Sequence, residues 1–403
     1  MGEQVTNAEQ SRTRPWRCQA AVLTPPGRGA VATLVVDGPD ATQAVSRLFR
    51  PATGWQLDRC PPDRVVFGYW VPHADPNAAP ARGAEEVVVC RHSAERIEVH
   101  CHGGSAAVEH VLGTLAAAGC EPVPAADWVL RHSGDRLVAE ARLALARART
   151  VRAAAVLLDQ HRGALSHCVA EAIEHIGAGR LDAAEQTLAA TRRWSAFGQR
   201  LVQPWQVVLV GRTNAGKSSL LNTLLGYRRS LVDSAAGTTR DVLTAVTAVG
   251  GWPVEFSDTA GSRSAASELE SEGIARAVRQ AAAADLLVVV TDLTVPWSAE
   301  DERWVQTAAQ EPVIVHNKCD LVSVIPADRP PGLVTSAVTA AGLPELLDRI
   351  AQRLVPTTPP SGVAVPFLAH HDQGLSLALQ ALREGRPERA SRLLRELLDP
   401  CGA

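Results

Sequence analysis

The chain has 403 residues, of which 46% are hydrophobic, and its formal net charge is −3. This length allows roughly two to four domains with substantial cores, and the near-neutral charge excludes a global basic field of the kind that attracts nucleic acid. The eight cysteines show no paired C-x-x-C spacing, which predicts reduced thiols. The first residues lack the apolar region of a signal peptide and no apolar run is long enough to span a membrane, so we expect a cytoplasmic protein.

Residues 1–123 are predicted to form a small α+β domain. Helical spacing of apolar residues begins after Pro39 and again after Gly104. Short apolar stretches bounded by turn residues predict strands at 20–23, 30–36, 64–71, 86–90 and 96–101.

The rest of the chain predicts a nucleotide-binding domain enclosed by helices. Residues 124–203 are rich in alanine, arginine and leucine with helical periodicity, which predicts antiparallel helices. Strands and helices alternate across 204–355, the pattern of a mostly parallel sheet flanked by helices. A proline-rich linker opens 356–403, where two further helices are predicted, so the fold class is a multi-domain α/β and α protein whose P-loop domain is inserted in a helical domain.

A phosphate-binding loop is predicted at 211–218, GRTNAGKS, directly after an apolar run at 207–210. At a strand-to-helix turn, the backbone N–H groups of a G-x-x-x-x-G-K-[ST] loop surround the α- and β-phosphates. Lys217 then reaches the β- and γ-phosphates, and the Ser218 hydroxyl coordinates Mg²⁺. The loop glycines allow this approach, because a Cβ would clash or refuse the backbone angles.

Two motifs for the γ-phosphate follow in the order typical of a GTPase. In AGTTRD, at 236–241, Thr239 is expected to complete Mg²⁺ coordination and to sense the γ-phosphate. In DTAG, Asp258 would hold Mg²⁺ through water, and the N–H of Gly261 would meet the γ-phosphate.

A guanine-specific motif, NKCD, occupies 317–320. The Asp320 carboxylate can accept two hydrogen bonds from guanine that adenine cannot offer, and such a site discriminates by roughly 10⁴ to 10⁵. Lys217 and Lys318 are the only lysines in the chain, which indicates that both positions need a compact ammonium or a straight apolar stem. The predicted nucleotide-binding residues, including Ser336 and Ala337 whose N–H groups would close over the base, are Asn214, Ala215, Gly216, Lys217, Ser218, Ser219, Thr238, Thr239, Asp258, Thr259, Ala260, Gly261, Asn317, Lys318, Asp320, Ser336 and Ala337.

These motifs resemble those of the MnmE (TrmE) tRNA-modification GTPases. The resemblance rests on GRTNAGKSSLLN, AGTTRDV, and DTAG followed by Arg263, Glu270 and GIARA at 273–277, together with TPPGRG at 24–29 and EVHCHGG at 98–104. It implies a homodimer formed through the N-terminal domain, with the G domains meeting across the nucleotide. It also implies an FAD-containing partner, MnmG, with which family members modify C5 of the wobble uridine in certain tRNAs from a folate one-carbon donor, so that tRNA is an indirect partner.

The resemblance further implies potassium activation, in which a cation takes the place of an arginine finger worth roughly 10³ to 10⁵ in rate. Glu270 is implied to orient the attacking water, although it could also be an ordinary solvent-facing helix residue. Asn214 could equally serve only to stabilise its loop. The implied potassium ligands are Asn214, Asp233, Ala235 and Thr238, the Mg²⁺ ligands are Ser218 and Thr239, and the catalytic residues are Glu270, Lys217, Thr239 and Gly261.

Departures from the family gather around the folate site. Val35 stands where the family has an arginine, 90–95 replaces the segment S-Y-T-G-E-D, a loop expected near 144–151 is not found, and 399–403 replaces F-C-I-G-K. Because basic groups for an anionic folate are missing at three places, we expect a weakened or lost folate pocket. The alternative function is therefore a divergent regulatory GTPase that has lost folate binding and the modification role.

Two other interpretations are disfavoured. A ribosome-assembly GTPase would need a terminal RNA-binding domain with a basic, glycine-rich loop, which is not visible. A metal site at His100, Cys101 and His102 is disfavoured because successive side chains of a strand point to opposite faces.

Overall fold

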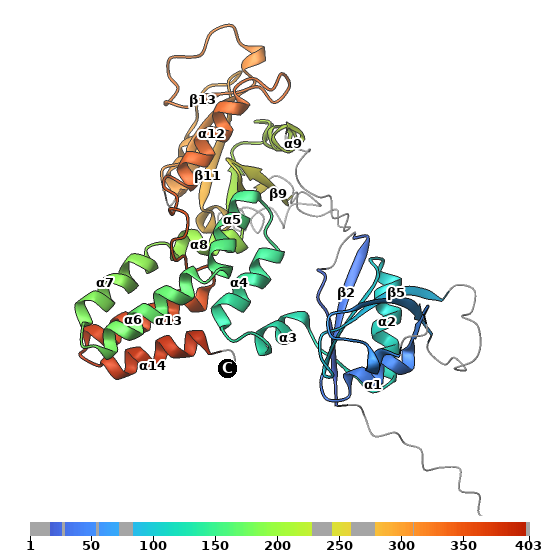
Figure 1. Cartoon of the computed structure of the whole chain (residues 1–403). Coiled ribbons are helices and arrows are strands. Elements are labelled where there is room, and N and C mark those ends of the chain that lie inside the picture. The colour runs from blue at the N-terminus through green and yellow to red at the C-terminus, as the bar shows by residue number, and fades with distance from the viewer. Residues whose placement is uncertain are drawn as a thin grey trace, which may run out of the picture. The chain divides into compact units, whose positions relative to one another are not determined.

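The computed structural model describes residues 17–25, 29–53, 56–71, 84–227, 244–258, 279–308 and 310–399. The chain forms two compact units, Met1–Ser133 and Gly134–Ala403, and each is described by itself (Figure 1). Within the described residues, no helix is both long and apolar enough to cross a membrane.

A seven-stranded sheet forms the first unit, in the order β3-β4-β5-β6-β2-β1-β7. Neighbouring strands are antiparallel except β1 and β7, which are parallel. All five strands predicted from short apolar stretches are present, whereas β3 and β7 have only three and two residues, too few to form a recognisable stretch. The bounds are β1 Gln19–Val22, β2 Val31–Asp37, β3 Phe49–Pro51, β4 Val65–Trp70, β5 Glu85–Arg91, β6 Arg96–His102 and β7 Glu121–Pro122.

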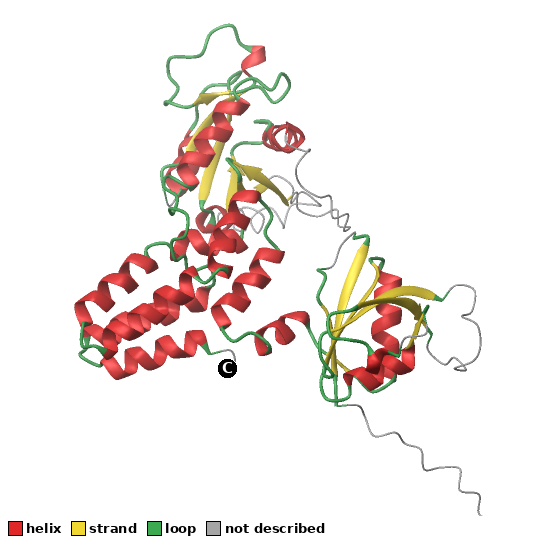
Figure 2. Cartoon of the chain, in the orientation of Figure 1, coloured by secondary structure: helices red, strands yellow, loops and turns green. Residues whose placement is uncertain are grey.

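Helices pack against this sheet and close its core (Figure 2). On β6, Ile97 and Val99 are fully buried against Val111 and Leu115 of helix α2. Glu98, between them in sequence, lies on the opposite face, as the two-residue period of a strand requires. The helices of this unit are α1 Ala41–Leu48, η1 Leu57–Arg59, α2 Ser105–Ala117 and α3 Ala125–Arg131.

The second unit contains one helical bundle assembled from two distant parts of the chain. Helices α13 and α14 pack against α4, α6, α7 and α8, and Figure 1 shows the green and red helices side by side. The buried Gln160 side chain adds a tie, because it donates to the Val363 carbonyl and accepts from the Val365 N–H, both at 3.0 Å. The bounds are α4 Arg136–Ala146, α5 Val151–His161, α6 Ala164–Gly177, α7 Leu181–Arg192, α8 Ser195–Val202, α13 Ala369–Arg383 and α14 Pro387–Leu398.

A six-stranded sheet lies in sequence between these two halves, in the order β13-β12-β11-β8-β10-β9. All pairs are parallel except β9 with β10, which confirms the mostly parallel sheet. Gly250 and Gly251 join β9 to β10 with φ values of 57° and 86°, the left-handed pair that a two-residue hairpin requires. The elements are β8 Trp205–Val210, α9 Lys217–Tyr227, β9 Thr244–Val249, β10 Trp252–Asp258, β11 Leu286–Asp292, α11 Ala299–Thr307, β12 Val313–Asn317, η3 Cys319–Leu321, β13 Leu333–Val334 and α12 Leu343–Leu354.

Candidate nucleotide-binding site

The predicted nucleotide residues gather at one edge of the six-stranded sheet. Strands β8, β10, β11 and β12 run parallel, so their carboxyl ends meet at the same edge. The phosphate loop follows β8, while Asp258, Asp292 and Asn317 are the last residues of the other three strands. Motifs separated by up to about one hundred residues are therefore brought together by strand order.

The backbone of the phosphate loop can be built only with glycine at two positions. Gly211 has φ 139°, and a Cβ there would lie 2.0 Å from the carbonyl oxygen of Val290. Gly216 has φ 90°, and its Cβ would lie 2.3 Å from Nδ2 of Asn317. Asn214, at φ 64°, is exposed and also left-handed, a conformation that asparagine tolerates better than most residues. Close approach to the neighbouring strands β11 and β12 is thus a second reason for these glycines, besides approach to phosphate.

Side chains of the loop already occupy positions that suit phosphate and a hard cation. Lys217 is buried and its Nζ donates to the carbonyl oxygens of Gly211 and Arg212, both at 2.8 Å. The Ser218 hydroxyl donates to Oδ2 of Asp258. A hydroxyl and a carboxylate oxygen in contact are the donor types that Mg²⁺ prefers, so these two residues fit the ion. The neighbouring Ser219 is exposed in the first turn of α9.

The buried Asn317 side chain connects the loops to one another. Its Nδ2 donates to the carbonyl oxygen of Ala215 at 3.0 Å, and its Oδ1 accepts from the N–H of Ala337 at 3.2 Å and the hydroxyl of Thr335 at 3.3 Å. Thr223 of α9 adds a hydrogen bond of 2.8 Å to the carbonyl oxygen of Ala337. The sequence placed Asn317 among the nucleotide residues, and the structure shows that it holds the phosphate loop and the loop after β13 together.

Lys318 is held in place by an aspartate that sequence reasoning missed. It has φ 67°, and its Nζ donates to Oδ2 of Asp292 at 2.6 Å. Burial raises the pKa of Asp292, but hydrogen bonds from Lys318 and Thr294 outweigh burial, so the pKa lies below its usual range. The available signal was an acidic residue ending the otherwise apolar strand β11.

The remaining guanine residues lie beside Lys318. Asp320 is exposed in η3, so its carboxylate is accessible to a base. The fully buried Ser336 donates its backbone N–H to the carbonyl oxygen of Ala341 at 3.1 Å, and the N–H of Ala337 donates to Asn317. Both N–H groups are engaged within the protein, so their closing over the base stays a prediction.

The buried His316 connects β12 to β11 and to the segment before β13. Nδ1 of His316 lies 2.9 Å from the Thr291 hydroxyl, and Nε2 lies 2.9 Å from the carbonyl oxygen of Pro330, to which it donates. Burial lowers the pKa of His316, so the ring is neutral at pH 7 and ties the segment before β13 to β12.

Several predicted site residues lie outside the described part of the chain, and their roles stay predictions. They include the switch residues, the proposed water-orienting glutamate and most of the implied potassium ligands. They are Asp233, Ala235, Thr238, Thr239, Thr259, Ala260, Gly261 and Glu270.

Known proteins are similar to this chain over most of its length. A family model described as "50S ribosome-binding GTPase" matches residues 206–318. The chain is 32% identical to the tRNA modification GTPase MnmE of Moorella thermoacetica, with 92% of this chain and 90% of that protein covered. Identity to the MnmE of Chloroflexus aurantiacus is also 32%, with 94% and 91% covered.

Among solved structures, the chain is similar to Era in complex with MgGDPNP and nucleotides 1506–1542 of 16S ribosomal RNA. That similarity covers 39% of this chain and 58% of the other at 27% identity, with a TM-score of 0.31. The similarity to MnmE proteins, at 32% identity, covers more than nine tenths of the chain. The chain therefore belongs to the MnmE family of tRNA modification GTPases.

Proposed function

We propose that this GTPase acts in C5 modification of the wobble uridine of tRNA, as a potassium-stimulated homodimer with an FAD-containing partner of the MnmG type. The observation that carries the proposal is the assembled nucleotide edge, in which one buried amide connects two loops and Ser218 contacts Asp258. A loop system held in this way binds GTP without a large ordering cost. The tRNA role rests on the long similarity to MnmE proteins.

The chain's own residues divide the work of GTP hydrolysis. Backbone N–H groups of the phosphate loop hold the α- and β-phosphates, and Lys217 exchanges its two loop carbonyls for phosphate oxygens. Ser218 and Asp258 would hold Mg²⁺, which when bound neutralises charge on the phosphate oxygens. Asp320 accepts from the guanine edge. We assign Thr239 and Gly261 to the γ-phosphate and Glu270 to the attacking water.

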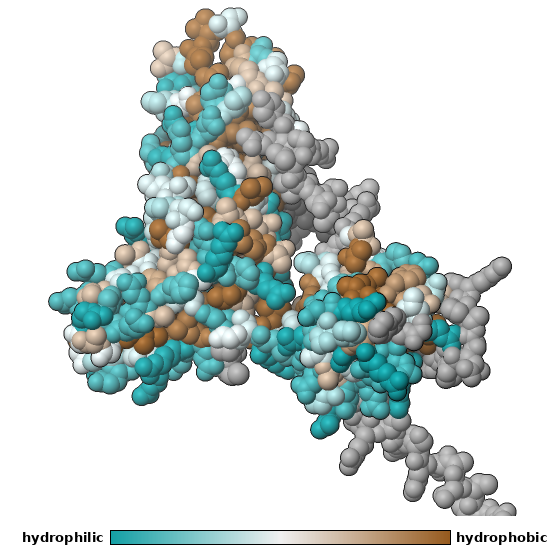
Figure 3. All heavy atoms as spheres, in the orientation of Figure 1, coloured by the Kyte–Doolittle hydropathy of each residue, from teal (hydrophilic) through white to brown (hydrophobic). Residues whose placement is uncertain are grey.

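Exposed apolar side chains next to the guanine motif support dimerisation of the nucleotide-binding parts. Leu321, Val324 and Ile325 are 65%, 80% and 50% exposed, and Val338 is 84% exposed. Figure 3 shows apolar side chains at the upper end of this part, where the orange loop of Figure 1 lies. Exposed apolar side chains gathered on a surface mark interaction sites. Leu321 directly follows Asp320, so a second G domain docking here would lie close to the nucleotide.

One observation favours the alternative, a regulatory GTPase without folate chemistry. Val35, at the position of the family's arginine, is fully buried in β2, and its Cα partner on β6 is Glu98. An apolar side chain there supplies no positive charge for an anionic folate. The nucleotide edge is unaffected by this change, so a switch could persist after the modification chemistry was lost.

Deletion of the gene, followed by nucleoside mass spectrometry of total tRNA, separates the two candidates. We expect loss of C5 aminomethyl-type uridines, restored by the wild-type gene but not by Ser218→Ala, which removes a Mg²⁺ ligand. The Val35→Arg variant serves as a probe of the folate position. An unchanged nucleoside profile in a cell with no second copy would overturn the modification role and favour the regulatory alternative.

A further inference from the structure

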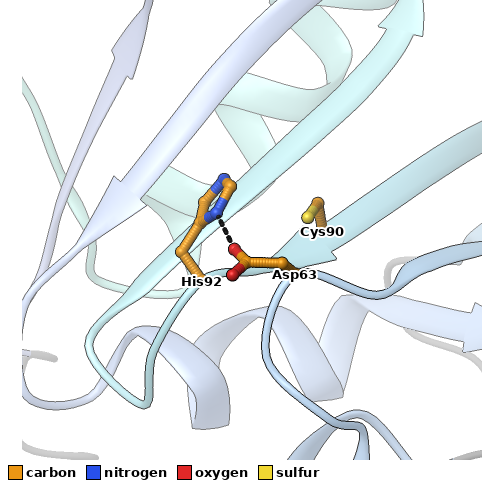
Figure 4. Close-up of side chains that lie close together, drawn as sticks. All are labelled: Asp63, Cys90 and His92. Carbon is orange, nitrogen blue, oxygen red and sulfur yellow. Dashed lines mark hydrogen bonds and ion pairs between the residues drawn. The ribbon is translucent and has the colours of Figure 1, made fainter.

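Three metal-ligating side chains converge in the first unit, away from the nucleotide motifs in sequence. Asp63, Cys90 and His92 each offer one ligand atom, and these atoms all lie within 4.8 Å of one another. Figure 4 shows the carboxylate of Asp63 drawn between the imidazole and the thiol. Cys90 is buried, His92 is half-buried and Asp63 is exposed. The cluster therefore lies at the protein surface, with the thiol on its buried side.

The segments that carry these residues are tied together by backbone hydrogen bonds. Cys90 belongs to β5 and His92 follows two residues later, so both side chains point to the same face. The N–H of Asp63 donates to the carbonyl oxygen of Arg91 at 2.8 Å, and the N–H of His92 donates to that of Arg96 at 3.0 Å. The three ligand positions are therefore preorganised by the sheet.

Asp63 adopts a left-handed backbone conformation. Its φ is 60°, a value that aspartate and asparagine adopt more readily than other residues with a Cβ. In this conformation Oδ1 of Asp63 lies 2.6 Å from Nδ1 of His92. The turn at Asp63 therefore places its carboxylate directly against the imidazole.

The second nitrogen of His92 has the surroundings of a metal-bound histidine. Nε2 is buried without a hydrogen-bond partner, although Oε2 of Glu98 lies only 3.3 Å away. Metal-ligating histidines commonly direct the ring nitrogen that does not bind the metal to a carboxylate, which fixes the tautomer. Here Nδ1 faces Asp63 and Nε2 faces Glu98, so Nδ1 is the nitrogen on the side of the cluster and Glu98 is the carboxylate next to the second nitrogen.

We propose that Asp63, Cys90 and His92 form a binding site for a divalent cation of the zinc class. A thiolate, an imidazole and a carboxylate are the donor types of zinc sites, with the fourth position left to water. Mg²⁺ and Ca²⁺ are disfavoured because they prefer oxygen ligands alone. A bound cation would join the segment before β4 to the β5–β6 hairpin, a role separate from GTP hydrolysis.

The other cluster with metal-ligand spacing in the described residues is satisfied without a cation. It consists of Glu140, His370 and His371. Nδ1 of His371 accepts from the N–H of Leu368 at 3.3 Å, so the ring hydrogen is on Nε2, which donates to Glu140 at 2.6 Å. Arg136 supplies a positive charge to the same carboxylate. The Asp63 cluster is thus the better candidate.

Cobalt titration of the full chain, after removal of metals with a chelator, tests this proposal. Co²⁺ bound by a thiolate gives a sulfur-to-metal charge-transfer band, which an all-oxygen Mg²⁺ site cannot produce. We expect one thiolate-bound Co²⁺ for each chain, displaced by Zn²⁺. The band should vanish in Cys90→Ser, and Glu98→Gln should weaken Zn²⁺ binding by about 10- to 100-fold.

A matched control is Cys168→Ser, because this thiol lies in α6 and contacts the Thr191 hydroxyl at 2.9 Å. It should leave the band unchanged. Asp63→Asn guards against misfolding, since its side chain is 73% exposed, and it should weaken the metal while keeping the GTPase rate. Absence of the band in the wild type, or an unchanged band in both Cys90→Ser and His92→Asn, would overturn the proposal.

Discussion

The side-chain amide of Asn317 shows how one residue can determine the geometry of a binding site it does not itself have to touch. It is 1% exposed and makes three hydrogen bonds to two other loops. Each buried polar group left without a partner costs roughly 1–3 kcal/mol. Its removal should therefore affect both stability and nucleotide binding.

We expect Asn317→Ala to lower the thermal unfolding temperature and to weaken GTP binding by at least tenfold, about 1.4 kcal/mol, because Ala215 and Ala337 lose their partner. Differential scanning fluorimetry and fluorescent-nucleotide titration measure the two effects. Asp320→Asn is the comparison, since Asp320 is exposed and its loss should reduce guanine preference without loss of stability. Normal GTP affinity in Asn317→Ala would contradict the assigned role.

Asn214 separates two roles that the sequence left open. If it ligates potassium, Asn214→Ala should lower the ratio of GTPase rates in KCl and NaCl to about one, because the cation replaces an arginine finger. If it only stabilises the left-handed turn at φ 64°, the rates in the two salts should fall together. Steady-state GTPase assays at equal ionic strength, with Asn222→Ala at an exposed position of α9 as the control, distinguish these results.

At the scale of elements, polar ties join segments that lie far apart in the chain. Glu140 of α4 accepts from His371 and His370 of α13. Burial raises the pKa of Glu140, but its hydrogen bonds to these histidines and to Arg136 outweigh burial and hold the pKa well below its usual range. Burial lowers the pKa of His371. The tie thus requires an ionised carboxylate and a neutral His371.

This tie predicts a loss of stability in acid. A His371 pKa below its unfolded value of about 6.5 means that the unfolded chain binds the proton first, so its contribution is present above about pH 6.5 and is lost as pH falls. The pKa of His316 is likewise lowered on folding, so this histidine also contributes stability that is lost as the pH falls. Glu140 adds a further loss at lower pH, because its pKa is also lowered on folding.

We therefore expect the denaturant midpoint to decrease as the pH is lowered from 7.5 to 5.5. The decrease should be smaller in His371→Gln, which cannot take up the proton. Urea unfolding followed by circular dichroism checks this. Gln380→Glu, on an exposed position of α13, provides a control for charge alone. An identical pH dependence in wild type and His371→Gln would show that this histidine does not carry the effect.

For the whole molecule, the exposed apolar side chains beside the guanine motif predict a nucleotide-dependent dimer. We expect Val324→Asp to abolish dimerisation of the G domains in the presence of K⁺ and a transition-state analogue, because a carboxylate would be desolvated at the contact. GTP affinity should be unchanged. Val151→Asp, at a valine 87% exposed on α5, is the matched control. Fluorescence energy transfer between labelled G domains measures the outcome, because the N-terminal domains are expected to keep the chain dimeric in any case. Full transfer in Val324→Asp would count against this surface.

Much of the architecture can be predicted from the sequence, because local patterns encode it. Short apolar stretches bounded by turn residues predicted β1, β2, β4, β5 and β6. Glycines and a lysine at the spacing that phosphate binding demands predicted the phosphate loop. The short strands β3 and β7 were not predicted, because two or three residues are too few to form a recognisable apolar stretch. Predictions at this level succeed where the physical requirement lies within a few residues.

The sequence by itself determined the family, the order of the nucleotide motifs and the enclosure of the G domain by helices, because each depends on residue types at short spacing. Only the tertiary structure decided which side chains meet across the chain. The Asn317 network, the tie between Glu140 and His371, the contact of Cys18 and Cys120 with sulfurs 2.8 Å apart, and the cluster at Asp63 belong to this class. These contacts join residues tens to hundreds of positions apart, and packing alone selects such pairs, since no local period of the sequence specifies them.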